Sequence, residues 1–259
     1  MAGFSLNEIT RKRRAMIERW TATFTRVYRS IGAQYLSRVE RDGISALLEF
    51  DDLDTKPLAT NFVELHVDVG TSFALWSRRK MKTRKATEED VEDEIYSVWV
   101  RDINEYTRTT TAKLIRTIQL TCEEEIKRIV GGIVQQGIKE GLPIEQLAKF
   151  VAEQFKEEWG EASKWMARRI AQTETIRASN YGVMKGVDSL GIPYVKSWLA
   201  ADDERTRPSH FDAEQNNARI PQDQKFIVGG YECDFPADAA LPPEESINCR
   251  CAWTAEPID

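Results

Sequence analysis

The sequence holds little of what several common classes of protein require. No apolar run approaches the roughly 18 residues of a membrane-spanning helix, and no apolar signal region opens the chain, so we expect assembly in a cytosolic, reducing compartment. Only four cysteines occur in 259 residues, so a disulfide framework is not needed for stability. A glycine-rich phosphate loop, a nucleophile elbow and an HExxH pattern are also absent from the sequence, which argues against several classes of enzyme.

Charge is distributed unevenly along the chain. The totals of 42 acidic and 36 basic residues give a net charge of −6, so composition alone gives no argument for nucleic-acid binding. Residues 1–50 contain nine basic and five acidic residues, whereas residues 199–259 contain five basic and thirteen acidic ones. We therefore expect the two ends to prefer different partners, with the N-terminal part oriented toward anionic surfaces.

Apolar residues recur every three or four positions through most of the first 190 residues, which predicts long amphipathic helices. Gly131-Gly132 should loosen or end one of them, and Gly160 should end another. Cys122 falls on an apolar face and is interpreted as a small buried hydrophobe. His66 lies at the edge of another such face, so we expect it to be packed or hydrogen-bonded.

Two basic clusters accompany these helices, one in the first helix and one after the second. A solvated helix face and contact with an anionic partner or DNA both explain such clusters. The second cluster has no interleaved aromatic residues and is therefore weak evidence for nucleic-acid recognition. The candidate contact residues are Arg11, Lys12, Arg13, Arg14, Arg78, Arg79, Lys80 and Lys82.

The pattern changes from helical to extended after Gly191-Ile192-Pro193. Residues that favour β structure alternate over 194–199, and further strands are expected at 226–228 and 250–254. We therefore predict a mainly α protein. A bundle of long helices over residues 1–160, the expected docking region, should precede a small α+β module with a short sheet over residues 161–259.

Several motifs of the C-terminal third follow one another in a distinctive order. They are Trp198, Asp202, Asp203, Arg205, Arg207, His210, Phe226 and the run Asn248-Cys249-Arg250-Cys251, preceded by a helix that contains residues 167–182. In order and spacing they resemble the C-terminal module of phage Mu F-like head morphogenesis proteins, the minor capsid proteins of tailed bacteriophages. The resemblance implies that a structural motif is formed by Trp198, Asp202, Arg205, Arg207 and Asn248.

The cysteines of this region are candidate metal ligands. In an extended chain Cys249 and Cys251 point to the same side, at a separation that a bridging metal ion tolerates better than a disulfide does. With His210 and Cys233 they would form a tetrahedral Cys₃His set, which suits structural zinc and leaves no position for a reactive water. Reduced, packed cysteines with His210 bonded to the acidic pair upstream, and a disulfide or catalytic site, remain open.

The resemblance implies a non-enzymatic minor head protein of the virion, assembled in the host cytoplasm. Such a protein binds the portal vertex and assists procapsid assembly and genome packaging or retention. The expected partners are the portal protein, with the major capsid or scaffolding protein and packaged DNA as further candidates, and no membrane. Two other classes stay open: a metal-assisted hydrolase acting on DNA or another phosphodiester, and an internal DNA-binding head protein.

Overall fold

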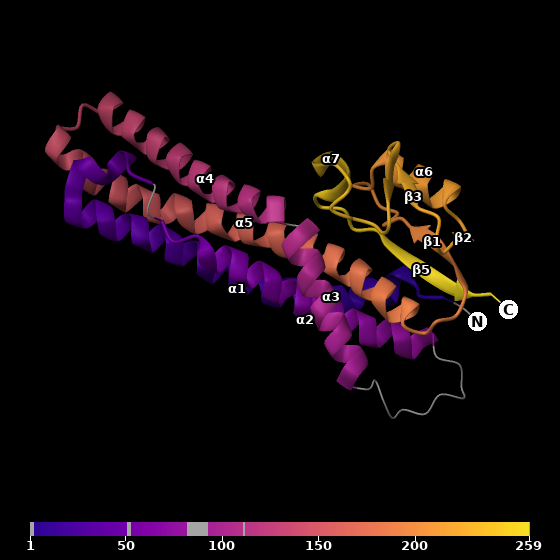
Figure 1. The fold of residues 1–259 in the computed structure, drawn as a ribbon. Coiled ribbons are helices and arrows are strands. Elements are labelled where there is room, and N and C mark those ends of the chain that lie inside the picture. Colours follow the sequence, from indigo (N-terminus) through magenta and orange to yellow (C-terminus); the bar gives the residue numbers. More distant parts are fainter. Residues whose placement is uncertain (1–2, 51–52, 82–92, 111, 259) are drawn as a thin grey trace. The chain divides into compact units, whose positions relative to one another are not determined.

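A computed structural model of the protein describes residues 3–50, 53–81, 93–110 and 112–258 (Figure 1). It confirms the mainly α class, with a small antiparallel sheet in the C-terminal part. The helices are α1 (Leu6–Asp42), the 3-10 helix η1 (Gly43–Leu48), α2 (Lys56–Met81), α3 (Asp93–Thr110), α4 (Ala112–Lys139), α5 (Ile144–Asp188), α6 (Pro208–Asn216) and α7 (Pro243–Ser246). The strands are β1 (Tyr194–Leu199), β2 (Ile220–Pro221), β3 (Phe226–Val228), β4 (Tyr231–Cys233) and β5 (Ala252–Pro257).

The chain forms two compact units, each assembled from separated segments of the sequence. We call one the helical unit, which contains Arg19–Phe62 and Ala112–Ile170. The other, here the mixed unit, contains Met1–Glu18, Val63–Thr111 and Ala171–Asp259. Because α1, α2 and α5 each contribute to both units, the functional boundary expected between residues 160 and 161 stays a prediction.

Two helices run through glycines that were expected to weaken or end them. α5 continues through Gly160, so the predicted end there is wrong, and α4 continues through Gly131-Gly132. A glycine inside a helix lowers its stability by only about 1 kcal/mol relative to alanine. Burial of neighbouring apolar side chains such as Ile133 and Trp159 outweighs that loss.

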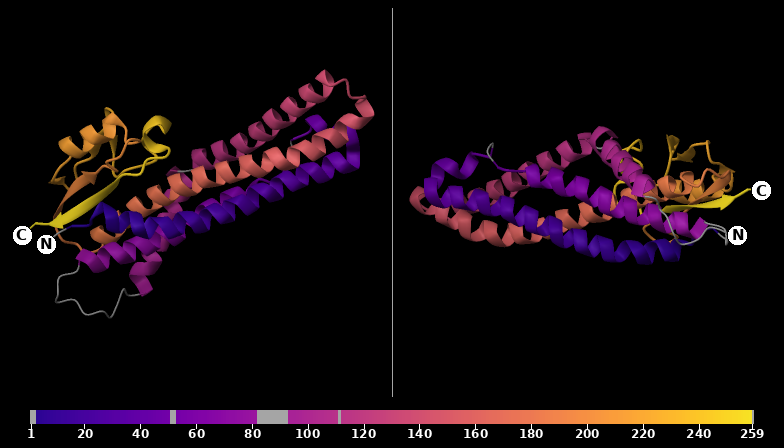
Figure 2. Two further views of the ribbon diagram at one scale, coloured as in Figure 1. Left: turned by 180° about the vertical axis from the view of Figure 1, so that it is seen from behind. Right: turned by 60° about the horizontal axis from the view of Figure 1, so that its bottom comes forward.

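Aromatic side chains fill the core of the helical unit. There, α4 and the first part of α5 run antiparallel to each other, and α5 lies beside α1 (Figure 2). The indole Nε1 of Trp159 donates to the carbonyl oxygen of Tyr28 at 2.9 Å, and Gly32 leaves the space into which this indole fits.

Cys122 is fully buried, and burial raises the pKa of its thiol to about 12. This confirms the prediction that Cys122 is a small buried hydrophobe.

The mixed unit carries both small sheets. Strands β2, β1 and β5 form one antiparallel sheet, in which Trp198 pairs with Trp253, and β3 pairs with β4 in a hairpin. The strands predicted at 194–199 and 226–228 are confirmed, whereas the last one starts at Ala252, where its pairing with β1 begins. The Nε1 of Trp253 donates to the carbonyl oxygen of Asn180 at 3.1 Å and so ties the sheet to α5.

Within the mixed unit, helices α2 and α5 lie so close together that their backbones are in contact. A Cβ atom added to Gly182 would lie 2.2 Å from the carbonyl oxygen of Gly70, and one added to Gly186 would lie 2.2 Å from that of Ala74. Only glycine fits at these two positions of α5. The close approach holds the second half of α5 against α2, and this half carries the polar residues described below.

We expect Gly182→Ala to lower the free energy of unfolding by about 1–3 kcal/mol or more, because the new methyl group meets backbone that cannot rotate away. The matched control is Gly131→Ala in α4, where a Cβ meets no atom within 4 Å. This substitution should raise stability by about 0.5–1 kcal/mol, since alanine is the better helix former. Urea unfolding of both variants checks the pair, and equal shifts of their midpoints would contradict the close approach.

Candidate metal centre and its buried supports

Three residues of the mixed unit bring metal-ligand atoms together. His210 lies in the first turn of α6, which Pro208 starts, and Cys249 and Cys251 lie between α7 and β5. All three are buried, and their ligand atoms lie within 4.8 Å of one another. The His210 Nδ1 is 3.2 Å from the Cys251 Sγ and 3.8 Å from the Cys249 Sγ. Zinc with bonds of about 2.3 Å to sulfur and about 2.0 Å to nitrogen separates tetrahedral ligands by roughly 3.6 Å, so the cluster could hold such an ion.

The structure does not bring Cys233 into this group, which reduces the predicted Cys₃His set to three residues. Cys233 ends β4, where it pairs with Phe226 of β3, and the hairpin turns its side chain into the core. Burial, together with the charges of Asp238 and Asp234, raises the pKa of its thiol far above the usual range. It is therefore a neutral core side chain rather than a ligand.

Glu245 is a residue of the site that the sequence did not reveal. Its Oε2 lies 2.9 Å from the Nε2 of His210 and also accepts a hydrogen bond from the Ser209 hydroxyl at 2.9 Å. The bond expected between His210 and the upstream acidic pair is therefore corrected to Glu245. Because a carboxylate faces Nε2, a proton on that nitrogen would leave the Nδ1 lone pair free for a metal ion held by the two sulfurs. Carboxylates orient metal-binding histidines in this way.

The two thiols of the cluster share a hydrogen bond that shifts their pKa values in opposite directions. The pKa of Cys251 is lowered to about 5, first by the hydrogen bond from Cys249 and then by His210. The same hydrogen bond, with burial, raises the pKa of Cys249 well above its usual value. One thiolate is thus already favoured without a metal ion, and a thiolate is the form that binds metal.

Arg13 of α1 lies buried beside the cluster, which corrects its expected role as a contact for an anionic partner. Its guanidinium donates to the Ser179 hydroxyl and the Asn180 side-chain oxygen, both at 2.7 Å, and to the Cys251 carbonyl oxygen at 3.1 Å. All three acceptors are uncharged. Burial lowers the pKa of Arg13 to about 10, against the opposing influence of the charged forms of the two cysteines. A thiolate in the cluster would therefore stabilise the charge of Arg13.

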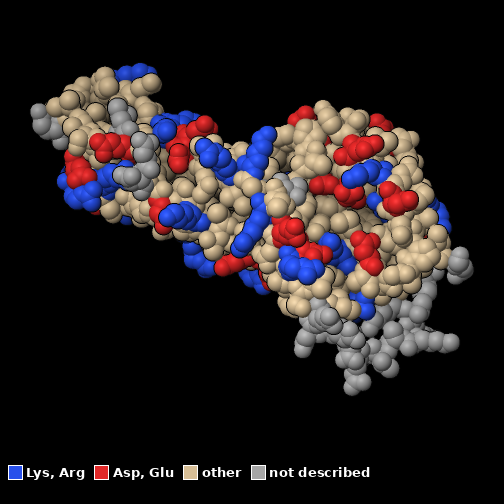
Figure 3. Space-filling view, viewed as in Figure 1, with Lys and Arg blue, Asp and Glu red and all other residues tan. Residues whose placement is uncertain are grey.

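Most other residues of the two basic clusters have partners within the chain. Lys12 contacts Ser72, and Arg14 contacts Glu18. Arg78 contacts Ser189, and Lys80 contacts Glu8. Arg11 and Arg79 are exposed, and Lys82 lies outside the described residues. On the face shown in Figure 3, basic and acidic side chains lie interspersed. An anionic partner would have to displace several of these contacts.

Trp198, a residue of the predicted structural motif, packs against the metal cluster. Its ring stands edge-on to the rings of His210, at 5.7 Å between centroids, and Phe226, at 5.5 Å. The side chain is 1% exposed. Trp198 therefore fixes the His210 ring from the sheet side, while Glu245 fixes it through Nε2.

The loop between β1 and α6 holds three further members of the motif, Asp202, Arg205 and Arg207. Asp202 takes a left-handed conformation with φ 51°, and Asp203 accepts the backbone N–H of Arg205 at 2.9 Å. Asp203 also forms an ion pair with Arg250, whereas Arg207 donates to the carbonyl oxygen of Ile247 at 2.7 Å. These bonds tie the loop to the segment between α7 and β5 that carries both cysteine ligands.

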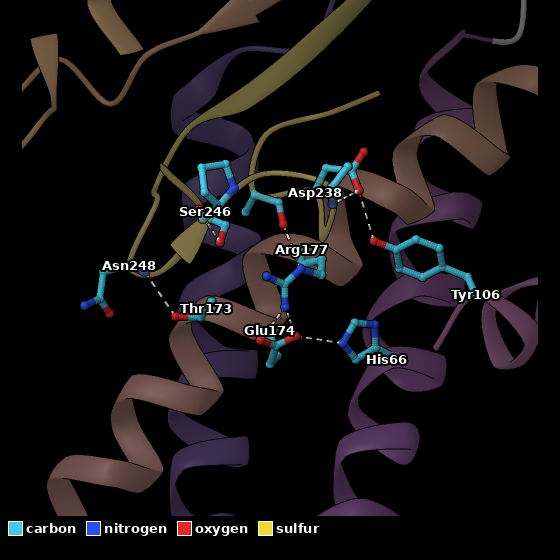
Figure 4. Close-up of polar contacts among 11 residues, drawn as sticks. His66, Tyr106, Thr173, Glu174, Arg177, Asp238, Ser246 and Asn248 are labelled. Carbon is cyan, nitrogen blue, oxygen red and sulfur yellow. Dashed lines mark hydrogen bonds and ion pairs between the residues drawn. The ribbon is translucent and has the colours of Figure 1, made fainter. Parts of the chain in front are cut away.

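A buried polar network joins α5 to the loops of the C-terminal module (Figure 4). The backbone N–H of Asn248, which has φ 57°, donates to the Thr173 hydroxyl at 3.1 Å. One turn further along α5, Arg177 forms an ion pair with Glu174 and donates from Nε to the Ala237 carbonyl oxygen at 2.7 Å. The Glu174 and Arg177 side chains are 6% and 1% exposed, so water screens their charges little.

His66 of α2 completes the network. Its Nε2 lies 3.0 Å from the Glu174 carboxylate, which confirms the hydrogen-bonded role predicted for it. Burial lowers the pKa of His66 and outweighs the opposing influence of Glu174. Burial alone would raise the pKa of Glu174, but Arg177 and His66 together bring it below the usual value. The network therefore holds a neutral histidine and an ionised pair.

We expect the stability of the protein to fall as the pH decreases from about 7 to 5. Unfolded His66 gains a proton near pH 6.5, whereas the folded residue with its lowered pKa does not. The stabilisation is thus present above the unfolded pKa and lost toward the folded one. His66→Gln keeps a donor for Glu174 and removes the titration, so its thermal midpoint should depend less on pH. Equal slopes for both proteins would refute this assignment.

These observations define a mainly helical protein with an α+β module that is rigidly braced around a candidate metal centre. Residues 128–254 match the family described as phage Mu protein F like protein. The match confirms the resemblance read from the sequence. The family supports a role in phage head morphogenesis and is generally structural.

One curated relative bears the name of an enzyme. The chain is similar to NAD(+)–arginine ADP-ribosyltransferase EFV of Enterococcus faecalis, with 31% identity over 139 residues. The match covers 52% of this chain and 27% of the relative, so the chain spans little more than a quarter of that protein. No solved structure matches the chain. Among the helices that the structure describes, none combines the length and apolar character of a membrane span.

Proposed function

We propose that this protein is a non-enzymatic minor head protein of a tailed phage, which binds the portal vertex and assists procapsid assembly and genome packaging or retention. The observation that carries the proposal is the family match over residues 128–254. Zinc held by His210, Cys249 and Cys251 would brace the C-terminal module. The virion head, after assembly in the host cytoplasm, would be its location.

The use of polar residues on α5 supports a structural role. Thr173, Glu174, Arg177, Ser179 and Asn180 could have formed an enzyme's polar site, yet all five are buried. Each is bonded to backbone or to another side chain of the mixed unit. Groups that are satisfied internally stabilise one arrangement of the module and are not free to bind a substrate.

The helical unit supplies the surface for docking. Among its described residues, large apolar side chains are exposed at fractions between 42% and 65% at Ile44, Leu120, Ile138, Ile144 and Trp165. Exposed aromatic side chains such as Trp165 are typical anchors of protein interfaces. Arg169 lies over the Trp165 ring at 5.3 Å and holds it in place. We therefore place the portal contact on this unit.

A metal-assisted hydrolase is the second candidate, because three ligands leave a coordination position for water. The pocket at the cluster argues against it, since no carboxylate that could act as general base lines it. Glu245 is held by His210 and Ser209. The DNA-binding alternative is weakened because Arg13, one of its candidate contacts, is buried. Loss of phosphodiester cleavage in His210→Ala, with the fold intact, would favour the hydrolase.

The proposal is tested by mixing the protein with purified portal protein and following co-migration in size-exclusion chromatography. Trp165→Ala should weaken binding by about tenfold or more, as removal of an interface anchor does. Tyr231→Ala is the matched control, because Tyr231 is also exposed but belongs to the mixed unit. Absence of co-migration with the unaltered protein would refute portal binding, and equal losses in both variants would refute the assigned surface.

A further inference from the structure

The candidate metal centre has fewer protein ligands than a closed zinc site requires. His210, Cys249 and Cys251 supply three donors, and Cys233 lies outside the group. Glu245 lies at Nε2, the nitrogen of the His210 ring that points away from the sulfurs, and so orients the ring instead of binding the ion. Structural zinc sites almost always have four ligands, so the fourth must come from elsewhere.

A small pocket gives access to the cluster. All three ligand residues line it, together with the residues Arg205, Arg207 and Arg250 and the exposed Asn248. No aspartate or glutamate contributes to the lining. Arg250 is paired with Asp203, whereas within the described residues neither Arg205 nor Arg207 forms an ion pair. The opening therefore favours an anion over a cation or a neutral donor.

The charge of the metal centre also favours an anion as the fourth ligand. A divalent ion with two thiolates and a neutral imidazole has no net charge. Arg13 is buried beside the two cysteines and bonds only to uncharged oxygens within the described residues, so its positive charge would stay uncompensated. A fourth ligand with one negative charge would give the centre a charge that Arg13 balances.

We propose that the metal centre keeps one coordination position open toward the arginine-lined pocket, and that a carboxylate fills it as the fourth ligand. The inference rests on the metal centre of the proposed function. The carboxylate can belong to a small anion or to an aspartate or glutamate of a bound protein. In the second case the metal ion would join this module directly to its partner.

Cobalt(II) tests the inference, because its visible absorption changes with the identity and number of its ligands. The protein is loaded with cobalt(II) in buffer free of carboxylates and then titrated with acetate. We expect a saturable change in the visible bands, with about tenfold weaker acetate binding in Arg205→Gln, which removes one charge-assisted contact. The matched control is Arg11→Gln, at an exposed arginine of α1 outside the pocket, which should bind acetate like the unaltered protein.

The outcomes distinguish the metal centre itself from its open coordination position. Failure to bind cobalt(II) would refute the metal centre and this inference with it. Binding of cobalt(II) with a spectrum that acetate leaves unchanged would overturn the open position alone. In a second arm purified portal protein replaces acetate. A matching spectral change that acetate competes away identifies a partner carboxylate, whereas a response to acetate alone identifies a small-anion site.

Discussion

Replacing Arg177 by methionine is expected to lower the free energy of unfolding by about 3–5 kcal/mol, because it leaves the buried Glu174 carboxylate without its cation. The Ala237 carbonyl oxygen would also lose the donor that ties its loop to α5. His66 remains as the other partner of Glu174, but burial keeps it neutral at pH 7. Urea unfolding at pH 7 measures the loss.

Two comparisons separate the buried ion pair from a general effect of losing arginine. Adding Glu174→Gln to Arg177→Met removes the unpaired charge and keeps an acceptor for His66, so the double variant should recover much of the stability. Arg14→Met removes an ion pair whose side chains are 82% and 68% exposed and should change stability by less than about 1 kcal/mol. A single variant as stable as the double one would show that Glu174 is not held as a buried charge.

The same pair marks a limit of prediction from sequence. Glu174 and Arg177 stand three residues apart, a spacing that indicates an ion pair on one helix face but does not tell whether that face is exposed. Whether that face is buried depends on Gly182 and Gly70, which let α2 approach, and on the loop that carries Ala237. Their contacts join residues far apart in the chain, so local periodicity could not reveal them.

The helices themselves could be predicted, since their apolar residues follow a regular period. The metal centre could be predicted in part. His210, Cys249 and Cys251 are recognisable from their chemistry alone, because imidazole and thiol are the preferred ligands of zinc. The exclusion of Cys233 from the ligand set depends on how the two three-residue strands β3 and β4 pair. The contact between Glu245 and His210 depends on where α7 lies. Neither leaves a periodic signal in the sequence.

Removal of bound zinc is the other change with a large expected effect. At free zinc a thousandfold above the dissociation constant, binding adds about 4 kcal/mol to stability, and chelation should remove it. The reason is that His210 on α6 and the two cysteines after α7 meet only in the folded chain. Elemental analysis of protein purified without chelator should give near one zinc per chain, and urea unfolding with and without chelator measures the loss.

Three substitutions test which residues hold the ion. Cys249→Ser and His210→Ala should lose the zinc and become insensitive to chelator, because each removes a ligand. Cys233→Ser is the matched control, since Cys233 is equally buried but lies outside the cluster, and it should keep the zinc while losing stability with and without chelator alike. Loss of zinc from folded Cys233→Ser would restore the four-ligand set. Absence of zinc from the unaltered protein would refute the metal centre and leave the hydrogen bond from Arg13 to the Cys251 carbonyl oxygen as a contact that braces the module.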